Sequence, residues 1–179
     1  MKNKKDYFKN YYKELSNLVI NFDETKIVGA AQKIKNIRKN NKLFLIGNGG
    51  SSSIANHVAT DFTKISNIRS VTFNETNLIT CFSNDYGFEN WPSKAVEKFG
   101  IKNDICVLIS SSGKSKNIIN AAKICKEKKI FLITFSGFSK DNQLKKLGNI
   151  NFWVNSNHYN YIEMTHHVWL VSIADYLSN

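Results

Sequence analysis

The chain has 179 residues, of which 42% are hydrophobic, which is the size and composition of a single globular domain. The apolar runs are too short to span a membrane, and the N-terminal segment has no hydrophobic signal core, so we expect a cytoplasmic protein. The 25 Lys and Arg residues against 14 Asp and Glu give a net charge of +11. The basic residues form no arginine-rich stripe, so a nucleic-acid role would rest on net charge alone and is not expected.

Two amphipathic helices are predicted ahead of the first strand. Apolar residues recur at three- and four-residue spacing over 4–21 and again over 23–40, and Asp23 can cap the second helix. Both helices have broad apolar faces, which favours packing against another subunit as well as against a sheet. We therefore expect an oligomer; packing within one chain is the alternative.

The next segment has the pattern of a strand, a glycine turn and a helix. The apolar run 43–46 is followed by Gly-Asn-Gly-Gly at 47–50, three serines, and helical spacing over 54–62. Glycines let backbone N–H groups approach a ligand, and the first turn of a helix favours negative charge. This turn is suited to a phosphate group; an ordinary tight turn capped by Ser51 is the alternative.

A second unit of the same kind strengthens the case for phosphate. The predicted strand 104–109 is followed by Ser-Ser-Ser-Gly-Lys-Ser at 110–115 and by helical spacing over 118–124. The other expected elements are strands at 68–73, 130–134 and 150–154, helices at 75–82, 91–99, 141–147 and 160–177, and a polar stretch at 83–89. Alternating strands and helices predict an α/β fold with a doubly wound, five-stranded parallel sheet, and both serine loops follow strands at the edge where ligands bind.

Titratable residues gather in two of the predicted helices. His57 and Asp61 are four residues apart and share a face, and Glu163 is aligned with both His166 and His167 in the last helix. If the two helices meet, these side chains can form a divalent-metal site or an acid–base pair. Solvated Glu–His pairs without a ligand are the alternative.

Taken together, these segments resemble the sugar-isomerase (SIS) domain family and, within it, the sedoheptulose-7-phosphate (phosphoheptose) isomerases. The resemblance rests on the two leading helices, GNGGS at 47–51, HVATD at 57–61, SNDYGFE at 83–89, SSSGKS at 110–115 and a histidine-containing last helix. It implies one SIS domain over 1–179, with oligomerisation helices at 1–41, a flavodoxin-like three-layer core at 42–179, and a homotetramer with shared active sites. It also implies zinc-dependent aldose–ketose isomerisation of a phosphosugar through an enediol.

The resemblance assigns roles residue by residue. It implies that the metal is held by His57, Asp61, Glu163 and His167, and that proton transfer uses Asp61 and His167, with His166 as the second choice. The implied substrate-binding residues are Asn48, Gly49, Gly50, Ser51, Ser52, Asp85, Ser110, Ser111, Ser112, Ser115 and Glu163.

The catalytic positions depart from the family pattern. Asp61 replaces a glutamate, Glu163 replaces a glutamine, and Val171 stands where the family has a histidine, for which His167, one turn earlier, is the candidate replacement. Such changes indicate altered chemistry or substrate, or a lost activity. Our leading prediction is a sedoheptulose-7-phosphate-type isomerase that feeds surface-polysaccharide heptose synthesis. The alternative is a non-catalytic SIS module that binds a phosphosugar or a protein partner as a regulator.

Overall fold

The computed structural model describes residues 4–179, with side chains from Asp6 on. Over these residues its centre is a five-stranded sheet in which every neighbouring pair of strands is parallel. The strands are β1 (Leu43–Ile46), β2 (Ser70–Val71), β3 (Ile105–Ser110), β4 (Phe131–Ser136) and β5 (Ile150–Trp153). Their order in the sheet is β2-β1-β3-β4-β5, so the chain winds outwards in both directions from the centre. The predicted doubly wound α/β fold is confirmed.

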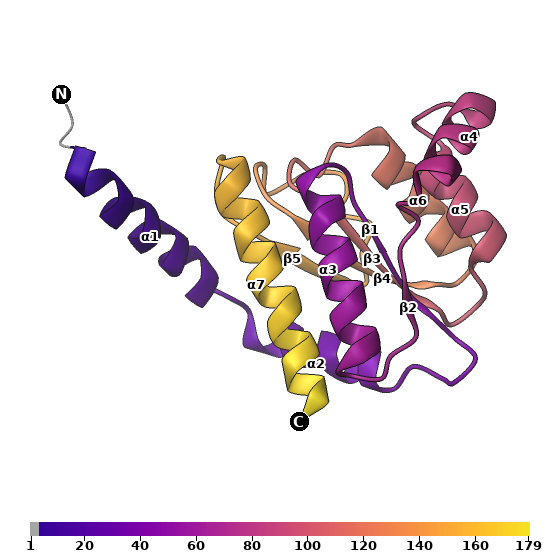
Figure 1. Ribbon diagram of the computed structural model, residues 1–179, viewed down its shortest axis with the longest axis horizontal. Helices are drawn as coiled ribbons and strands as arrows, with labels where there is room; N and C mark the ends of the chain where they lie inside the picture. Colours follow the sequence, from indigo (N-terminus) through magenta and orange to yellow (C-terminus); the bar gives the residue numbers. More distant parts are fainter. Residues whose placement is uncertain (1–3) are drawn as a thin grey trace.

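The described residues also form seven helices (Figure 1). They are α1 (Lys4–Ile20), α2 (Glu24–Lys35), α3 (Gly50–Lys64), α4 (Thr76–Tyr86), α5 (Trp91–Phe99), α6 (Lys116–Glu127) and α7 (Tyr159–Ser178). One apolar core lies between the sheet and α2, α3 and α7, and a second lies between the sheet and α5 and α6. Residues 1–3 of the predicted N-terminal helical region lie outside the described residues.

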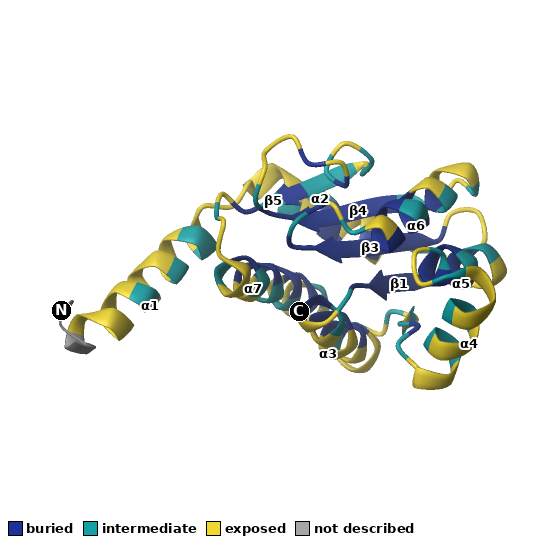
Figure 2. Cartoon of the chain, turned by 90° about the horizontal axis from the view of Figure 1, so that it is seen from above, coloured by how far each residue is buried: buried dark blue, intermediate teal, exposed yellow. Residues whose placement is uncertain are grey.

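The central strands are buried on both faces. In β1, Leu43 and Leu45 point into the core beneath α3 and α7, whereas Phe44 and Ile46 point into the core beneath α5 and α6. Successive side chains of a strand face opposite sides of a sheet, so a strand covered on both sides must be apolar at every position. Figure 2 shows β1 and β3 as buried along their length, and β4 is buried at every residue after its first.

Two predicted helix boundaries are wrong. Helix α2 was expected to reach residue 40, but it ends at Lys35, and the chain then turns so that the buried amide of Asn41 can donate to Asp104 Oδ1 at 2.9 Å. Helix α4 extends through part of the stretch expected to be a polar loop and ends at Tyr86; the next residue, Gly87, has a φ of 82°, which suits glycine.

The short helix predicted at 141–147 is also wrong, because this segment forms turns. The side-chain amide of Asn142 donates to Ser136 Oγ at 3.0 Å and to Ser139 O at 2.9 Å, and its oxygen accepts from the backbone N–H of Lys145 at 2.9 Å. A side chain that satisfies backbone groups in this way competes with helical hydrogen bonding.

Helix α1 projects away from the body of the molecule (Figure 1). It is tied to α7 at its C-terminal end, where Trp169 Nε1 donates to Val19 O at 2.9 Å. Farther out, the aromatic side chains of Tyr7, Phe8 and Tyr12 are 61%, 64% and 62% exposed. Among the residues described here, no helix combines the length and the apolar character needed to cross a membrane.

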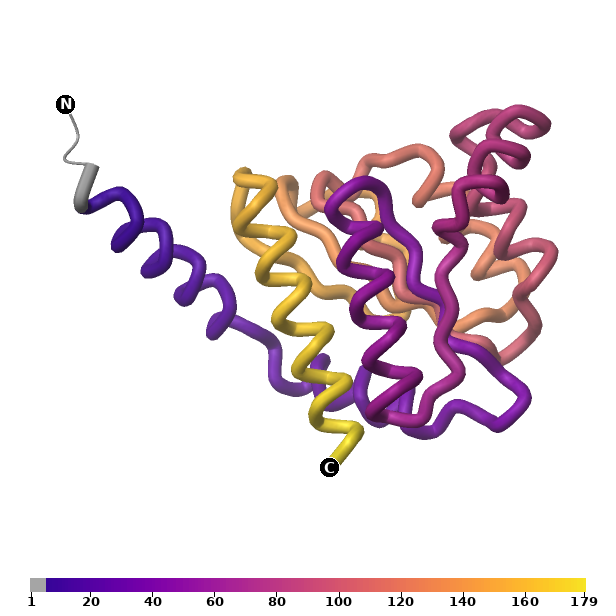
Figure 3. The backbone as a smooth tube through the Cα atoms, viewed as in Figure 1, coloured from indigo at the N-terminus to yellow at the C-terminus, as the bar shows by residue number. Residues whose placement is uncertain are grey.

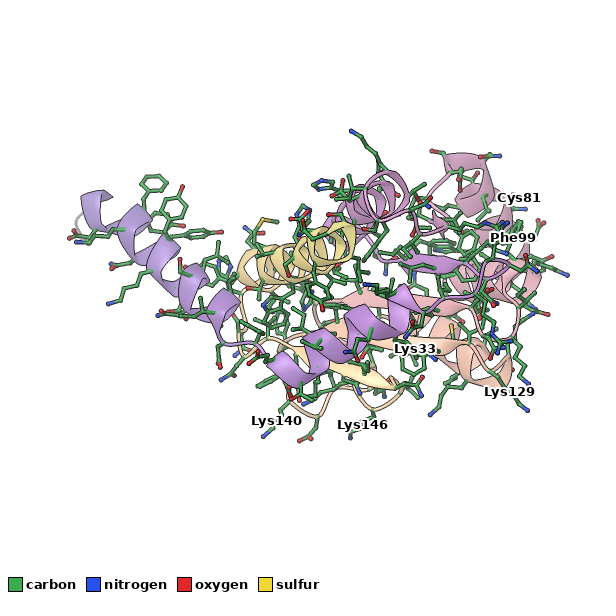
Figure 4. All side chains as sticks on the ribbon, turned by 90° about the horizontal axis from the view of Figure 1, so that it is seen from below. Lys33, Cys81, Phe99, Lys129, Lys140 and Lys146 are labelled. Carbon is green, nitrogen blue, oxygen red and sulfur yellow. The ribbon has the colours of Figure 1, made fainter. Side chains whose placement is uncertain are left out.

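The lysines are spread around the molecule, as the sequence indicated. In Figure 4, Lys33 lies on α2, Lys129 lies between α6 and β4, and Lys140 and Lys146 lie on the connection between β4 and β5. The positive charge seen in this view is therefore distributed over several segments rather than gathered on one element.

The carboxyl ends of the strands and the first turns of α3 and α7 lie at the same edge of the sheet (Figure 3). Strands β1 and β3 are neighbours, with Ile46 paired to Leu108, so the loops that follow them are adjacent. Helices α3 and α7 pack side by side over the same face, which brings the titratable residues of both helices to one region.

Candidate functional site

The first loop runs from the end of β1 into α3. A side chain at Gly47 would collide with the backbone of Ser51, because an added Cβ would lie 2.6 Å from Ser51 C. Gly49 has a φ of 53° and precedes the first residue of α3, and no side chain caps this helix. The first N–H groups of α3 are therefore available to an acceptor at the ligand-binding edge.

The second loop runs from the end of β3 into α6. Ser110 and Ser111 are buried, Gly113 has a φ of 63°, and the hydroxyl of Ser110 donates to Ser115 Oγ at 3.1 Å. Ser115 is the residue before α6 and makes no capping hydrogen bond, while the N–H of Ile118 in the first turn donates to Asn117 Oδ1 at 3.0 Å. Both predicted serine loops thus have glycine-dependent turns and open helix N-termini.

A pair of asparagines joins the two loops. Asn48 Nδ2 donates to Asn117 Oδ1 at 2.9 Å, and Asn117 Nδ2 donates to Asn48 Oδ1 at 2.8 Å. Sequence reasoning selected Asn48 but missed Asn117, which is buried in the first turn of α6. The sequence signal that was available for Asn117 is a polar residue in the first turn of the helix that follows the serine loop.

The carboxylate of Glu163 lies between the loops. Its Oε1 accepts from Ser111 Oγ at 3.4 Å, and the Ser51 hydroxyl is a second donor. Gly50 lies so close that a Cβ there would collide with the carboxylate. Burial raises the pKa of Glu163, and the hydrogen bonds from the Ser111 and Ser51 hydroxyls oppose this increase.

A separate cluster on α3 and α7 contains the other predicted catalytic residues. His57 Nδ1 lies 2.7 Å from His167 Nε2, and His57 Nε2 lies 3.3 Å from Asp61 Oδ2. His57 is largely exposed, with 55% of its side chain accessible. Burial and the nearby His57 lower the pKa of His167, whereas Asp61 acts in the opposite direction.

The donor atoms of this cluster can be compared with those that the predicted zinc ion would require. Two imidazoles and a carboxylate are donors that zinc accepts, but two ligands of one tetrahedral zinc lie roughly 3.3 Å apart. The 2.7 Å between His57 and His167 is instead a hydrogen-bond distance, and Glu163 turns towards the serines. Over residues 4–179, no group of three or more His, Cys, Asp or Glu side chains is placed to hold a metal. The residues as arranged do not fit zinc, which remains a prediction from the resemblance.

His166 differs from its neighbour His167 because it points into the core. Its side chain is fully buried, and its Nε2 donates to Ser136 O at 3.1 Å. Burial lowers the pKa of His166 to about 4, so the ring is neutral near pH 7. Of the two histidines considered from the sequence, His167 is the one that meets His57.

Three other predicted binding residues lie at the periphery. Asp85 is in the last turn of α4, where its carboxylate accepts from Asn84 Nδ2 at 3.0 Å, and no hydrogen bond between described residues joins it to either serine loop. Ser52 is in the first turn of α3, where its N–H donates to Gly49 O at 3.0 Å. Ser112 accepts from the N–H of Lys114 at 3.2 Å.

A cleft of about 440 Å³ opens beside the second loop. It is lined by Asn48, Gly87, Phe88, Glu89, Ser115, Lys116 and Asn117. Its volume lies within the range of small-molecule sites, and it combines the amide pair and the α6 N-terminus with an exposed aromatic ring. The candidate site therefore has two serine loops, a cleft beside the second of them, and a separate imidazole–carboxylate cluster.

Comparison with known proteins identifies the family of this chain. Residues 6–137 match the SIS domain family. The chain is 40% identical over 114 residues to phosphoheptose isomerase 2 of Campylobacter jejuni, an alignment that covers 59% of this chain and 56% of that protein. The chain thus spans little more than half the length of this curated relative.

Longer matches agree with this result. A probable phosphoheptose isomerase of Thermoplasma acidophilum is 34% identical over 88% of this chain and 90% of its own length. The solved structure of a phosphoheptose isomerase from Neisseria gonorrhoeae superposes with a TM-score of 0.89 over 98% of both chains, at 23% identity. At that identity the structural likeness supports the fold, and with the sequence matches it shows that this chain belongs to the SIS domain family.

Proposed function

We propose that this chain is a phosphosugar isomerase that interconverts an aldose phosphate and a ketose phosphate, with sedoheptulose 7-phosphate as the first substrate to test. The main supporting observation is that two serine loops, joined by Asn48 and Asn117, lie at the same end of the sheet as a His–His–Asp cluster. The named relatives support the same class of reaction.

The second loop and α6 hold the phosphate in this proposal. Ser112 and Ser115 supply hydroxyl donors, Ser115 at the N-cap of α6 makes no capping hydrogen bond, and the cleft beside them accommodates the sugar. Lys116, which lines the same cleft, adds positive charge. These groups bind and orient the substrate.

The cluster on α3 and α7 moves the proton. An aldose–ketose isomerisation needs a base that takes a proton from one carbon and returns it to the next. Asp61 Oδ2 accepts from Nε2–H of His57, so Nδ1 of His57 accepts from Nε2–H of His167, and Nδ1 of His167 keeps its lone pair. That nitrogen is the proposed base, and no step is assigned to a metal.

The proposed active enzyme is a homotetramer with shared active sites. The open position of His57 and the exposed aromatic face of α1 support this part of the proposal, because a neighbouring subunit would cover both. Exclusion of water by such a neighbour would protect the reactive enediol.

A non-catalytic phosphosugar-binding module is the second candidate. It is favoured by the exposed histidine cluster and by the carboxylate of Glu163, which already occupies part of the first loop. In both candidates the chain binds a phosphosugar, so only turnover distinguishes them.

The deciding experiment is an isomerase assay on purified protein with sedoheptulose 7-phosphate and a panel of shorter ketose phosphates. Wild type is compared with His167→Ala, and His158→Ala is the matched control because it removes an imidazole from the N-cap position of the same helix. Turnover lost in His167→Ala and retained in His158→Ala supports the enzyme. Binding without turnover of any substrate, with and without added divalent metal, supports the second candidate.

A further inference from the structure

Both arginines of the chain line one pocket. The sequence has 25 basic residues but only two arginines, and each arginine ends the same tripeptide, Asn-Ile-Arg, at 36–38 and at 67–69. The first tripeptide directly follows α2, and the second lies between α3 and β2. The isoleucine and the arginine of both tripeptides line a pocket of about 480 Å³. Two copies of one short motif, far apart in the sequence, thus meet at one place.

The pocket lies at the opposite edge of the sheet from the serine loops. It is formed where α2, α3 and α7 end, and Leu177 near the end of α7 is part of its lining. Figure 1 shows α3 and α7 running from the edge with the serine loops to the edge at which α2 lies. A small ligand in this pocket is therefore separated from the candidate functional site by the length of these two helices.

Hydrogen bonds between distant segments hold the walls of the pocket in place. Arg69 Nη1 donates to Lys39 O at 3.0 Å, and the backbone N–H of Leu43 in β1 donates to Arg69 O at 2.9 Å. Ser66 Oγ donates to Ala174 O at 2.8 Å, which joins the chain after α3 to α7. The pocket is therefore built from several tied segments rather than from one loop.

The lining of the pocket is strongly basic. None of its lining residues is acidic, and four are cationic: Lys35, Arg38, Lys39 and Arg69. None of the four forms an ion pair with a residue described here. Lys35 is in the last turn of α2, where a cation offsets the partial negative charge of a helix C-terminus. The other three lie in the connections beyond the helices, so that role does not account for them.

The apolar part of the lining indicates the rest of the ligand. Ile37, Ile68 and Leu177 are partly buried and pack against the core beneath the pocket. A sugar placed over such a surface would lose hydrogen bonds from its hydroxyls to water, whereas an aromatic base would not. A guanidinium group presents paired N–H donors that match phosphate oxygens, and the volume of the pocket lies within the range of small-molecule sites.

We propose that this pocket is a second ligand site, which binds a nucleoside diphosphate through Arg38 and Arg69. The diphosphate lies against the two guanidinium groups, and the base packs on the apolar residues of the lining. The concave shape favours a small ligand over a nucleic-acid strand. This inference does not rest on the proposed isomerase function, because it uses none of the residues of the candidate functional site.

The test is isothermal titration calorimetry of the complete chain with ADP, without divalent metal, which would neutralise the phosphate charges. Wild type is expected to bind one ADP per chain. Arg38→Gln is expected to weaken this binding roughly tenfold or more, as for lost hydrogen bonds to a charged group, and it leaves the bond between Arg69 and Lys39 in place. Lys123→Gln, which removes the same charge from an exposed position on α6, is the control and is expected to bind ADP as wild type does.

Two further measurements locate the ligand. Ser115→Ala, at the second serine loop, is expected to leave ADP binding unchanged, and pyrophosphate is expected to bind more weakly than ADP because it lacks the base. Arg69→Gln is an independent second variant if Arg38→Gln folds poorly, and it is expected to weaken ADP binding to a similar extent.

Several results would overturn the inference. They are no ADP binding to wild type, equal losses in Arg38→Gln and Lys123→Gln, a loss in Ser115→Ala, or pyrophosphate binding as tightly as ADP. Single-stranded RNA that binds more tightly than ADP, and loses that affinity in Arg38→Gln, would assign the pocket to a nucleic acid instead. Each of these outcomes is read without any measurement of phosphosugar turnover.

Discussion

Asn48 and Asn117 exchange two amide hydrogen bonds, of 2.9 and 2.8 Å, across 69 residues of sequence. Each residue belongs to a different strand–loop–helix unit, so the pair fixes the position of one loop relative to the other. This contact holds the two serine loops together at one place, and its removal is the most direct test of whether they act as a single site.

Replacing Asn117 by alanine is expected to weaken phosphate binding about tenfold and to lower the free energy of unfolding by about 1–3 kcal/mol, because the amide of Asn48 loses its buried partner. Phosphate titration and urea unfolding measure the two effects. Asn120→Ala is the control, since that amide donates to Glu89 O and Asn90 Oδ1 outside the asparagine pair. Equal effects of both changes would show that the pair has no special role.

The charge coupling between His57, Asp61 and His167 predicts two opposite pKa changes. Removing His57 by His57→Ala takes away a neighbour that lowers the pKa of His167, so that pKa should rise. Asp61→Asn removes the neighbour that raises it, so the pKa of His167 should fall. NMR titration of the imidazole C–H signals measures both without an activity assay.

Asp175→Asn is the matched control for this titration, because Asp175 lies on α7 two turns beyond His167. It is expected to leave the pKa of His167 unchanged. A shift of the same sign in the His57 and Asp61 variants would contradict this charge coupling.

Much of the fold could be predicted because its signals are local. The apolar run 43–46 and the glycines and serines after it define a strand, a turn and a helix within about 20 residues, and each preference acts on near neighbours. The helix expected at 141–147 failed because Asn142 bonds to Ser136, a contact outside the segment that gave the pattern.

The site was harder to predict because α7 is apolar on several faces. Ile162, Trp169 and Leu170 are all buried, so periodicity did not show which of His166 and His167 faces α3. Adjacent helical residues are separated by about 100° of rotation, which sends one ring into the core and the other to His57. The direction of Glu163 was likewise set by packing against Gly50 rather than by sequence spacing.

The exposed aromatic face of α1 predicts that a second chain covers it. Purified protein is expected to have the mass of four chains of 20.4 kDa each in multi-angle light scattering, and Phe8→Ser with Tyr12→Ser is expected to reduce that mass. Ile101→Ser changes an equally apolar exposed residue, 49% accessible, just beyond α5 and is the control. A monomeric wild type would remove the oligomer from the proposal.

The buried ring of His166 predicts a loss of stability in acid. Its pKa is about 4 in the folded chain and about 6.5 in an unfolded one, so the unfolded state binds more protons between these values. Stability is therefore fully retained above about pH 6.5 and falls as the pH drops towards 4, by about 3 kcal/mol from this residue alone. Urea unfolding of wild type and of His166→Gln over this range measures the difference.

The glutamine variant is expected to be less stable at pH 7, where it loses well-packed contacts with Phe135, and to lose the part of the acid dependence that the imidazole contributes. Parallel pH profiles for the two proteins would mean that the ring is protonated in the folded chain, which would require a second buried acceptor at Nδ1, where the described residues offer none.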